Sequence, residues 1–272
     1  YFFTRERITE ELLEQEAARV ANGETAAEAT KKVAIKDQIK VCLHDKYWWL
    51  IIVFFFLYQF GGQMKNIDMT FYSAAFTGEY SLSGMINTVG AIPTAAGMAI
   101  VWPIANRFNK AKTIIMGSCV ALVGGAIAFL CLIPALSEGV PLWVVSIASF
   151  CIKALGTAPA MYISLALMAN VLDHQEARYG IRTDGFTMAV YGSIMIAMSG
   201  ICNGVIVGIN NALGSSPLLH TFLGFGVEAI CYAIMGGMFF FMDVENFIDE
   251  DKQILAAKNV VAEQPAEQAV AE

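Results

Sequence analysis

The chain has 272 residues, of which 57% are hydrophobic and only 15% carry a formal charge. Its mean hydropathy of +0.57 is too high for a soluble globular domain of ordinary composition. The net charge of -7 comes mostly from acidic residues near the two ends, so it gives no reason to expect a nucleic-acid partner.

Residues 1–46 are polar and are predicted to be a partly helical cytosolic segment. Thr9–Glu14 fits a first helix that stops at Asn22 and Gly23. A second helix over residues 26–43 would lie against the rest of the protein, although its lysines also suit a membrane surface. Because the chain opens with Tyr1 rather than Met, we expect it to be a fragment of a longer protein.

Six long apolar runs follow, and each can supply the roughly 20 residues that a helix needs to cross a bilayer core. They are Tyr47–Asn66, Leu82–Ile104, Thr113–Leu136, Pro141–Ala169, Phe186–Asn210 and Pro217–Met242. The sequence therefore predicts an all-α integral membrane protein with a six-helix bundle over residues 47–242. Residues 243–272 are expected to form a cytosolic tail that is partly disordered.

The positions of the basic residues predict how the chain crosses the membrane. All of the 17 Lys and Arg residues except Lys65 and Lys153 lie on one side of the six spans. The positive-inside rule makes that side cytoplasmic, so both ends of the chain are expected in the cytoplasm. We expect a multi-pass protein of the cell (inner) membrane.

Span four carries an ionisable residue at membrane depth, where such residues are costly and usually functional. Lys153 lies about twelve residues into the span, or roughly 18 Å along a helix. Ser149 and Thr157 share its helical face, so this polar face is predicted to line a water-filled substrate pathway. The alternative is a structural lysine paired with Glu228 in span six. A second, less favoured alternative is that Glu228 is a proton-coupling carboxylate.

Spans one and five add polar candidates to the same pathway. Gln59 and Gln63 stand one helical turn apart, and amides offer both donors and acceptors to a polar substrate. In span five, Asn203 is predicted to bind the substrate, and Tyr191 is predicted to stack on it. The alternative for the amides is hydrogen bonding between helices.

A charged connector joins spans four and five between Asp173 and Gly185. Its charged side chains are Asp173, Glu176, Arg178, Arg182 and Asp184. We predict that they form the ion pairs of a cytoplasmic gate. Such a gate requires several pairs acting together, since a single exposed ion pair contributes little stability. The alternative is a solvated turn whose charges only set the topology.

The residue types that commonly carry catalysis are not grouped within the spans, which argues against an enzyme. No His/Asp/Glu cluster or nucleophile elbow lies at membrane depth, and the six cysteines include no CxxC pair. No catalytic residue, metal site or cofactor is therefore expected.

The order of Asp, Glu, Gly, Arg, Asp and Gly in the connector resembles the connector between helices 10 and 11 of the glycoside–pentoside–hexuronide:cation symporters. These are sugar transporters of the major facilitator superfamily. The opening Tyr1–Arg7 looks like the exit from their helix 6, and Pro103–Lys110 resembles the connector of helices 8 and 9. In this register the whole chain resembles the carboxy-terminal half, helices 7–12, of a twelve-helix transporter.

The resemblance implies symport of a sugar or glycoside with Na⁺ or H⁺ by alternating access of two bundles. It also implies that the coupling ion binds mainly to a missing amino-terminal six-helix bundle. The expected partners of the chain are therefore this bundle, the lipid bilayer and the sugar or glycoside substrate. Tyr191 stands where some relatives carry a lysine, so the familiar cation and substrate preference does not transfer directly. The alternative is a six-span scaffold or sensory subunit without transport activity.

Overall fold

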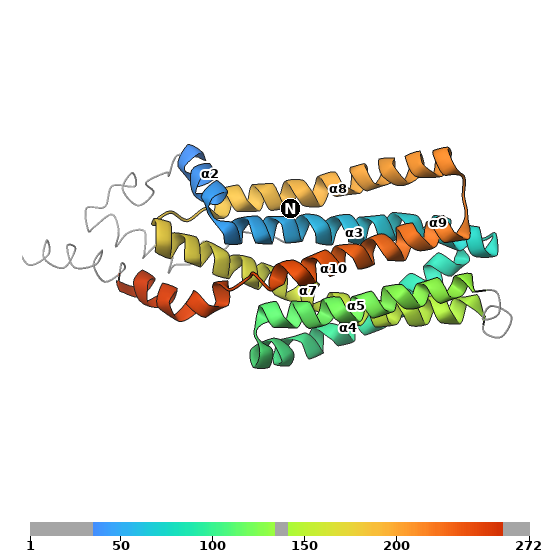
Figure 1. Ribbon diagram of the computed structural model, residues 1–272, viewed down its shortest axis with the longest axis horizontal. Coiled ribbons are helices and arrows are strands. Elements are labelled where there is room, and N and C mark those ends of the chain that lie inside the picture. The colour runs from blue at the N-terminus through green and yellow to red at the C-terminus, as the bar shows by residue number, and fades with distance from the viewer. Residues whose placement is uncertain (1–34, 134–140, 258–272) are drawn as a thin grey trace, which may run out of the picture.

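The computed structural model describes residues 35–133 and 141–257, and the regular structure in these ranges is entirely helical (Figure 1). The helices are α2 (Ile35–His44), α3 (Lys46–Thr77), α4 (Ser81–Phe108), α5 (Lys110–Ala128), η1 (Phe129–Leu132), α7 (Leu142–Tyr179), α8 (Asp184–Leu213), α9 (Pro217–Thr221), η2 (Phe222–Gly226), α10 (Val227–Phe239) and η3 (Val244–Phe247). A further helix covers residues 248–257. Six of the helical segments are long and apolar enough to cross a membrane, which confirms the predicted fold class.

The observed helices extend beyond the apolar runs that predicted them. α3 continues past Asn66 to Thr77, and α7 continues past Ala169 to Tyr179. Hydropathy detects only the apolar part of a helix, whereas the backbone continues until a residue stops it. Gly78 and Gly180 stop these two helices, because both adopt the left-handed conformation that favours glycine. The predicted helix at Thr9–Glu14 and the Tyr1–Arg7 motif lie outside the described residues.

The sixth span differs from a regular helix. A short α9 is followed by η2, a π-helical turn over Phe222–Gly226, and only then by α10. Turns of this kind inside α-helices are rare and frequently lie at functional sites. Hydropathy gave no sign of this break, since the whole segment is apolar.

The six spans pack in the order α4, α7, α5, α10, α3 and α8. α7 lies between α4 and α5, α10 joins α5 to α3, and α8 packs on the other side of α3. α4 and α8 are thus the two ends of the row and the least buried spans. Their remaining apolar surface is available to lipid or to another bundle.

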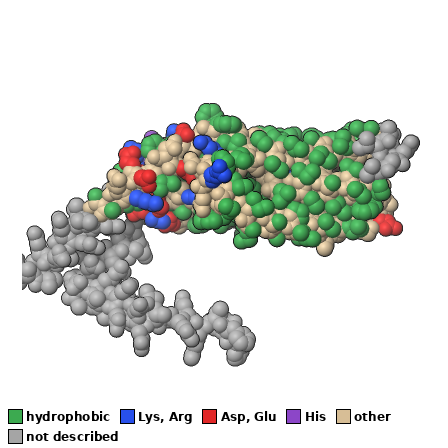
Figure 2. All heavy atoms as spheres, turned by 90° about the horizontal axis from the view of Figure 1, so that it is seen from below, with side chains coloured by type: hydrophobic (Ala, Val, Ile, Leu, Met, Phe, Trp, Pro, Cys, Tyr) green, Lys and Arg blue, Asp and Glu red, His purple; other side chains and the backbone are tan. Residues whose placement is uncertain are grey.

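The two ends of the bundle differ in charge. Figure 2 shows Lys, Arg, Asp and Glu gathered at one end of the molecule, while the rest of this face is largely hydrophobic. We call this the charged end; α3 and α8 begin there, and α4 and α7 end there (Figure 1). The end that carries Gly78 and Gly214 is called the opposite end.

Close packing of α5 on α7 depends on small residues. A Cβ atom added to Gly156 would lie 2.3 Å from the backbone nitrogen of Ala121, and one added to Gly124 would lie 2.5 Å from that of Lys153. Glycine lets the two helices approach closely, which is how helices commonly associate in membranes. This seam fixes the depth and direction of Lys153.

We expect Gly156→Leu to lower the free energy of unfolding by roughly 1–3 kcal/mol, because the added side chain has no space between α5 and α7. The midpoint of thermal unfolding of the detergent-solubilised protein measures this change. The control is Gly237→Leu, since a Cβ atom on this exposed glycine of α10 would meet nothing within 4 Å. Equal effects of the two changes would contradict the importance of the seam.

Candidate functional site

A buried ion pair joins α7 to α10. The ammonium of Lys153 contacts the Oε2 atom of Glu228, and the two side chains are 2% and 5% exposed. The ammonium also lies 4.4 Å from the ring centroid of Phe225 and 5.4 Å from that of Phe150. A single charge buried here would be very costly, so each group makes the charge of the other tolerable. The structure thus contains the pairing that the sequence offered as an alternative.

A polar cavity of about 270 Å³ opens beside this pair, between α3, α7 and α10 with one residue of α4. Its volume is close to the lower end of the range for small-molecule sites, about 300–1,000 Å³. Amides, hydroxyls and charges converge on it, among them Gln59, Gln63, Thr157, Lys153 and Glu228. The cavity can therefore both donate hydrogen bonds to a polyhydroxylated ligand and accept them from it.

Four of the seven predicted pathway residues meet at this cavity: Gln59, Gln63, Lys153 and Thr157. The amide of Gln59 also donates a hydrogen bond of 3.3 Å to the carbonyl of Met195, which ties α3 to α8. The Thr157 hydroxyl donates to the carbonyl of Ala154 in its own helix. Both predicted functions of the glutamines, lining the pathway and joining helices, are thus compatible with their positions.

The other three predicted residues lie elsewhere. The Ser149 hydroxyl is fully buried and donates a 2.6 Å hydrogen bond to the carbonyl of Gly124 in the α5–α7 seam. Tyr191 packs edge-on against Phe55, with ring centroids 4.6 Å apart. Asn203 is exposed on α8. Helical spacing alone could not distinguish the seam side of α7 from the cavity side.

Further cavity residues were not predicted as site residues. Tyr58 and Tyr232 line it from α3 and α10, and Lys65 places its ammonium 4.9 Å from the ring centroid of Phe150. A signal was present in the sequence, because Tyr58 and Lys65 are two turns apart and Tyr232 follows Glu228 by one turn. Aromatic residues in apolar spans are usually interpreted as core residues, so this helical spacing is easily overlooked.

At the charged end, Arg182 gathers three of the predicted gate carboxylates. Its guanidinium lies 2.5 Å from Asp184, 2.9 Å from Glu176 and 3.1 Å from Asp173. Hydrogen bonding to Asp184, together with the other carboxylates, raises the pKa of Arg182 above its ordinary value, although partial burial opposes this. The cluster is about half exposed, so water and salt weaken each pair.

Arg178 does not join this cluster. It contacts Glu250 at 3.5 Å and lies over the ring of Phe247, so it reaches residues after α10. Beside it, Nδ1 of His174 lies 2.7 Å from Asp251 in a buried pair. These contacts hold the helix at residues 248–257 against the end of α7.

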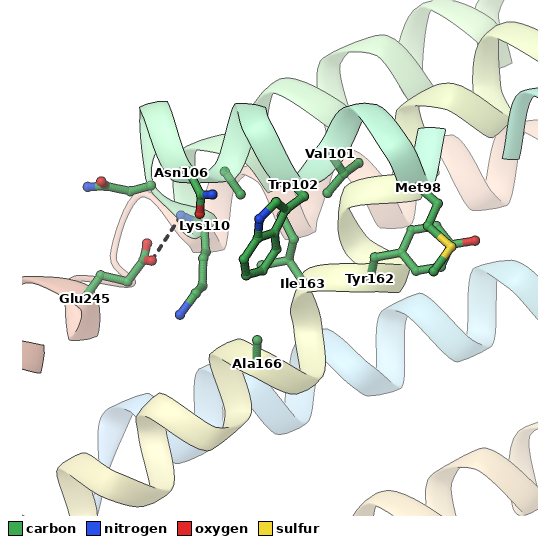
Figure 3. Close-up of a pocket in the computed structure, with 11 residues that line it drawn as sticks. Met98, Val101, Trp102, Asn106, Lys110, Tyr162, Ile163, Ala166 and Glu245 are labelled. Carbon is green, nitrogen blue, oxygen red and sulfur yellow. Dashed lines mark hydrogen bonds between the residues drawn. The ribbon is translucent and has the colours of Figure 1, made fainter. Parts of the chain in front are cut away.

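A second, more open cavity of about 440 Å³ lies between α4 and α7 near the charged end (Figure 3). Trp102, Met98 and Ile163 give it a largely apolar wall. At one side Glu245 accepts hydrogen bonds of 3.0 and 2.9 Å from the backbone N–H groups of Lys110 and Ala111. Glu245 thus caps the start of α5, where a carboxylate is favourable. The cavity's polar side chains Asn106, Lys110 and Glu245 gather at one side, and Glu245 is used in capping α5 (Figure 3). We therefore favour the first cavity as the site.

We expect Lys153→Met to destabilise the protein by about 3–5 kcal/mol, because it leaves Glu228 buried without an opposite charge. Adding Glu228→Gln should recover much of this loss, since the second change removes the unpaired charge. Thermal unfolding in detergent measures both effects. If Lys153→Met alone leaves the protein as stable as the original and as the double variant, the stability of the protein does not depend on pairing Lys153 with Glu228.

The geometry agrees with the comparisons with known proteins. The chain matches the family described as MFS/sugar transport protein over residues 13–242. Comparison with curated proteins and with solved structures gave no significant match. The family match covers most of the chain and all six apolar spans. The chain therefore belongs to the MFS/sugar transport protein family of the major facilitator superfamily and is a multi-pass membrane transporter.

Proposed function

We propose that this chain is the carboxy-terminal half of a cation-coupled symporter for a sugar or glycoside, of the glycoside–pentoside–hexuronide type. The polar cavity beside Lys153 and Glu228 is the observation that carries the proposal. A sugar hydroxyl can accept a hydrogen bond from the ammonium and donate one to the carboxylate, so that it bridges the two charges. Gln63 and Thr157 can bind neighbouring hydroxyls, and Tyr58 and Tyr232 offer rings to the apolar faces of a sugar.

Transport requires a second wall to the cavity. In our proposal an amino-terminal six-helix bundle supplies it and covers α4 and α8, the two least buried spans. That bundle also holds most ligands of the coupling ion, Na⁺ or H⁺. Rocking of the two bundles then exposes the cavity alternately to the two sides of the membrane. No further cofactor or nucleic acid takes part in this mechanism.

The charged end lies in the cytoplasm in this proposal, on the inner side of the cell membrane, and both ends of the chain are there. The support is the positive-inside rule, since Arg107, Lys110, Arg178 and Arg182 all lie near this end. The Arg182 cluster is then part of a cytoplasmic gate. When the cavity opens inward, the ion pairs within this cluster and those between its carboxylates and the amino-terminal bundle replace one another.

We expect cells or vesicles that contain the full-length protein to accumulate labelled glycosides when a Na⁺ or proton gradient is present. Gln63→Ala should raise the half-saturating concentration about 2- to 10-fold, because one hydrogen bond contributes roughly 0.5–1.5 kcal/mol. The folded Lys153→Met/Glu228→Gln variant should not transport. Uptake is measured with and without the gradient, over a broad panel of sugars.

The control is Ser118→Ala, which removes a hydrogen bond to Ile114 within α5 and outside the cavity. It should leave the half-saturating concentration unchanged. Absence of uptake across the whole panel would contradict the substrate class and favour a scaffold or sensory subunit. Uptake that is the same with and without a Na⁺ or a proton gradient would contradict symport.

We expect Arg182→Gln to lower the maximal uptake rate while changing stability by less than about 1 kcal/mol for each lost pair, because these pairs are exposed. Arg178→Gln is the matched control, since Arg178 contacts Glu250 and not the cluster. Uptake rates and thermal unfolding are compared for the two variants. An unchanged rate for Arg182→Gln would favour a solvated turn without a gating function.

A further inference from the structure

A second buried polar pair lies toward the opposite end of the bundle, away from the cavity. Nδ1 of His220 in α9 is 2.8 Å from Oδ1 of Asp68 in α3, and neither side chain is exposed. The ring of Phe71 stacks on the imidazole with centroids 5.8 Å apart. The pair joins the first and last spans where both approach the opposite end.

The other nitrogen of the same imidazole faces the surface. Ser215 is exposed in the connector between α8 and α9, and its hydroxyl lies 3.0 Å from Nε2 of His220. The three side chains therefore form a continuous line of hydrogen bonds from the surface to a carboxylate in the interior. A hydroxyl and an imidazole can each accept and release a proton, so this line is chemically able to pass one inward.

The carboxylate at the inner end is incompletely satisfied. Oδ2 of Asp68 has no hydrogen-bond partner among the described residues, although it is buried. On its open side is Gly224 of the π-helical turn, where an added Cβ atom would lie 3.3 Å from this oxygen. A neutral imidazole beside an ionised carboxylate leaves one net negative charge in an apolar site, which is unfavourable. One added proton makes the pair neutral overall.

The elements that pack against α3 and α9 carry other ionisable side chains, and these have their own partners. In the parts of the chain that the structure describes, α3, α8, η1, α7 and α10 supply Lys65, Tyr72, Cys131, Cys202, Lys153 and Glu228. Lys65 lies over Phe150, Tyr72 bonds Ser146 at 2.8 Å, and Lys153 pairs with Glu228. Among these described groups, His220 alone contacts the Asp68 carboxylate.

We propose that Asp68 and His220 form a proton-binding site that fills from the aqueous phase at the opposite end. A hydronium ion gives a proton to the Ser215 oxygen as that hydroxyl releases its own proton to Nε2. One O–H bond of the hydronium ion breaks, one N–H bond forms, and a water molecule remains outside. The proton stays on the imidazolium beside the carboxylate. The site requires no sugar, so it goes beyond the proposed transport function.

Binding of the proton links the position of α9 to pH. With the proton, an imidazolium–carboxylate pair holds α9 on α3. Without it, the uncompensated carboxylate favours entry of water and separation of α9 from α3. The π-helical turn at Phe222–Gly226 directly follows α9 and precedes Glu228, so movement of α9 reaches the wall of the cavity through one short segment.

The test compares the thermal unfolding midpoint of the full chain with that of Asp68→Asn between pH 5 and pH 8, where histidines titrate. In the original protein the folded state binds the extra proton, so the pair stabilises at low pH and this stabilisation is lost as pH rises. In the variant a buried neutral His220 resists protonation, so its stability falls as pH falls. We expect the variant to be less stable at pH 5 and the difference to shrink or reverse at pH 8.

A difference that is the same at every pH would overturn the proposal. His174 and Asp251 form another buried pair, and their contribution cancels in the comparison as long as Asp68→Asn does not alter it. Repeating the comparison in a His174→Gln background removes that pair and should leave the result unchanged. Disappearance of the pH dependence in this background would show that the difference acts through His174 and would overturn the proposal.

A measurement on the unaltered protein covers the case in which Asp68→Asn does not fold. Histidine labelled with ¹⁵N gives three imidazole signals, from His44, His174 and His220. At pH 5 the signal of the His220 imidazole should show a proton on both nitrogens. A neutral His220 imidazole at pH 5 would overturn the proposal. Neither measurement involves a sugar, so failure here is distinct from failure of transport.

Discussion

The ion pair between Lys153 and Glu228 is the interaction on which the polar part of this bundle depends. An ammonium and a carboxylate can stay inside an apolar bundle because they neutralise each other, and their contact sets how α7 faces α10. Close packing at Gly124 and Gly156 holds the backbone of α7 against α5, which leaves Lys153 no other depth. The cavity forms beside the pair, where hydroxyls and amides replace part of the hydration that both charges lost.

The sixth span has two buried ionic contacts with different character. Glu228 has a lysine partner and faces the cavity, whereas His220 has an aspartate partner and connects to the surface through Ser215. The first pair joins two groups of opposite formal charge, and in our proposal the second changes its net charge with one proton. The π-helical turn between His220 and Glu228 places the two contacts on one segment. A single element can therefore carry a response to protons and a contact with the substrate.

The hydrophobic pattern predicted six spans, and within the described residues the structure has a spanning helix at each of them, because bilayer thickness imposes a minimum apolar length. It did not predict where α3 and α7 end, since glycines at the helix ends rather than hydropathy decide this. It also missed the break in the sixth span. Of the candidate pathway residues, Gln59 and Gln63 on α3 meet Lys153 and Thr157 on α7 at the cavity. Ser149 instead takes part in the packing of α7 on α5.

The sequence by itself determined that this is a six-span helical membrane protein, which residues lie within the spans, and that Lys153 and Glu228 are available to pair. Those conclusions follow from local properties: apolar length, helical period and the cost of a charge in lipid. Only the tertiary structure decided which face of each helix meets which neighbour. For that reason it alone brought Asp68 to His220 and gathered three carboxylates around Arg182 while directing Arg178 to Glu250. Such contacts depend on the rotation and close approach of helices far apart in the chain, and no local pattern encodes them.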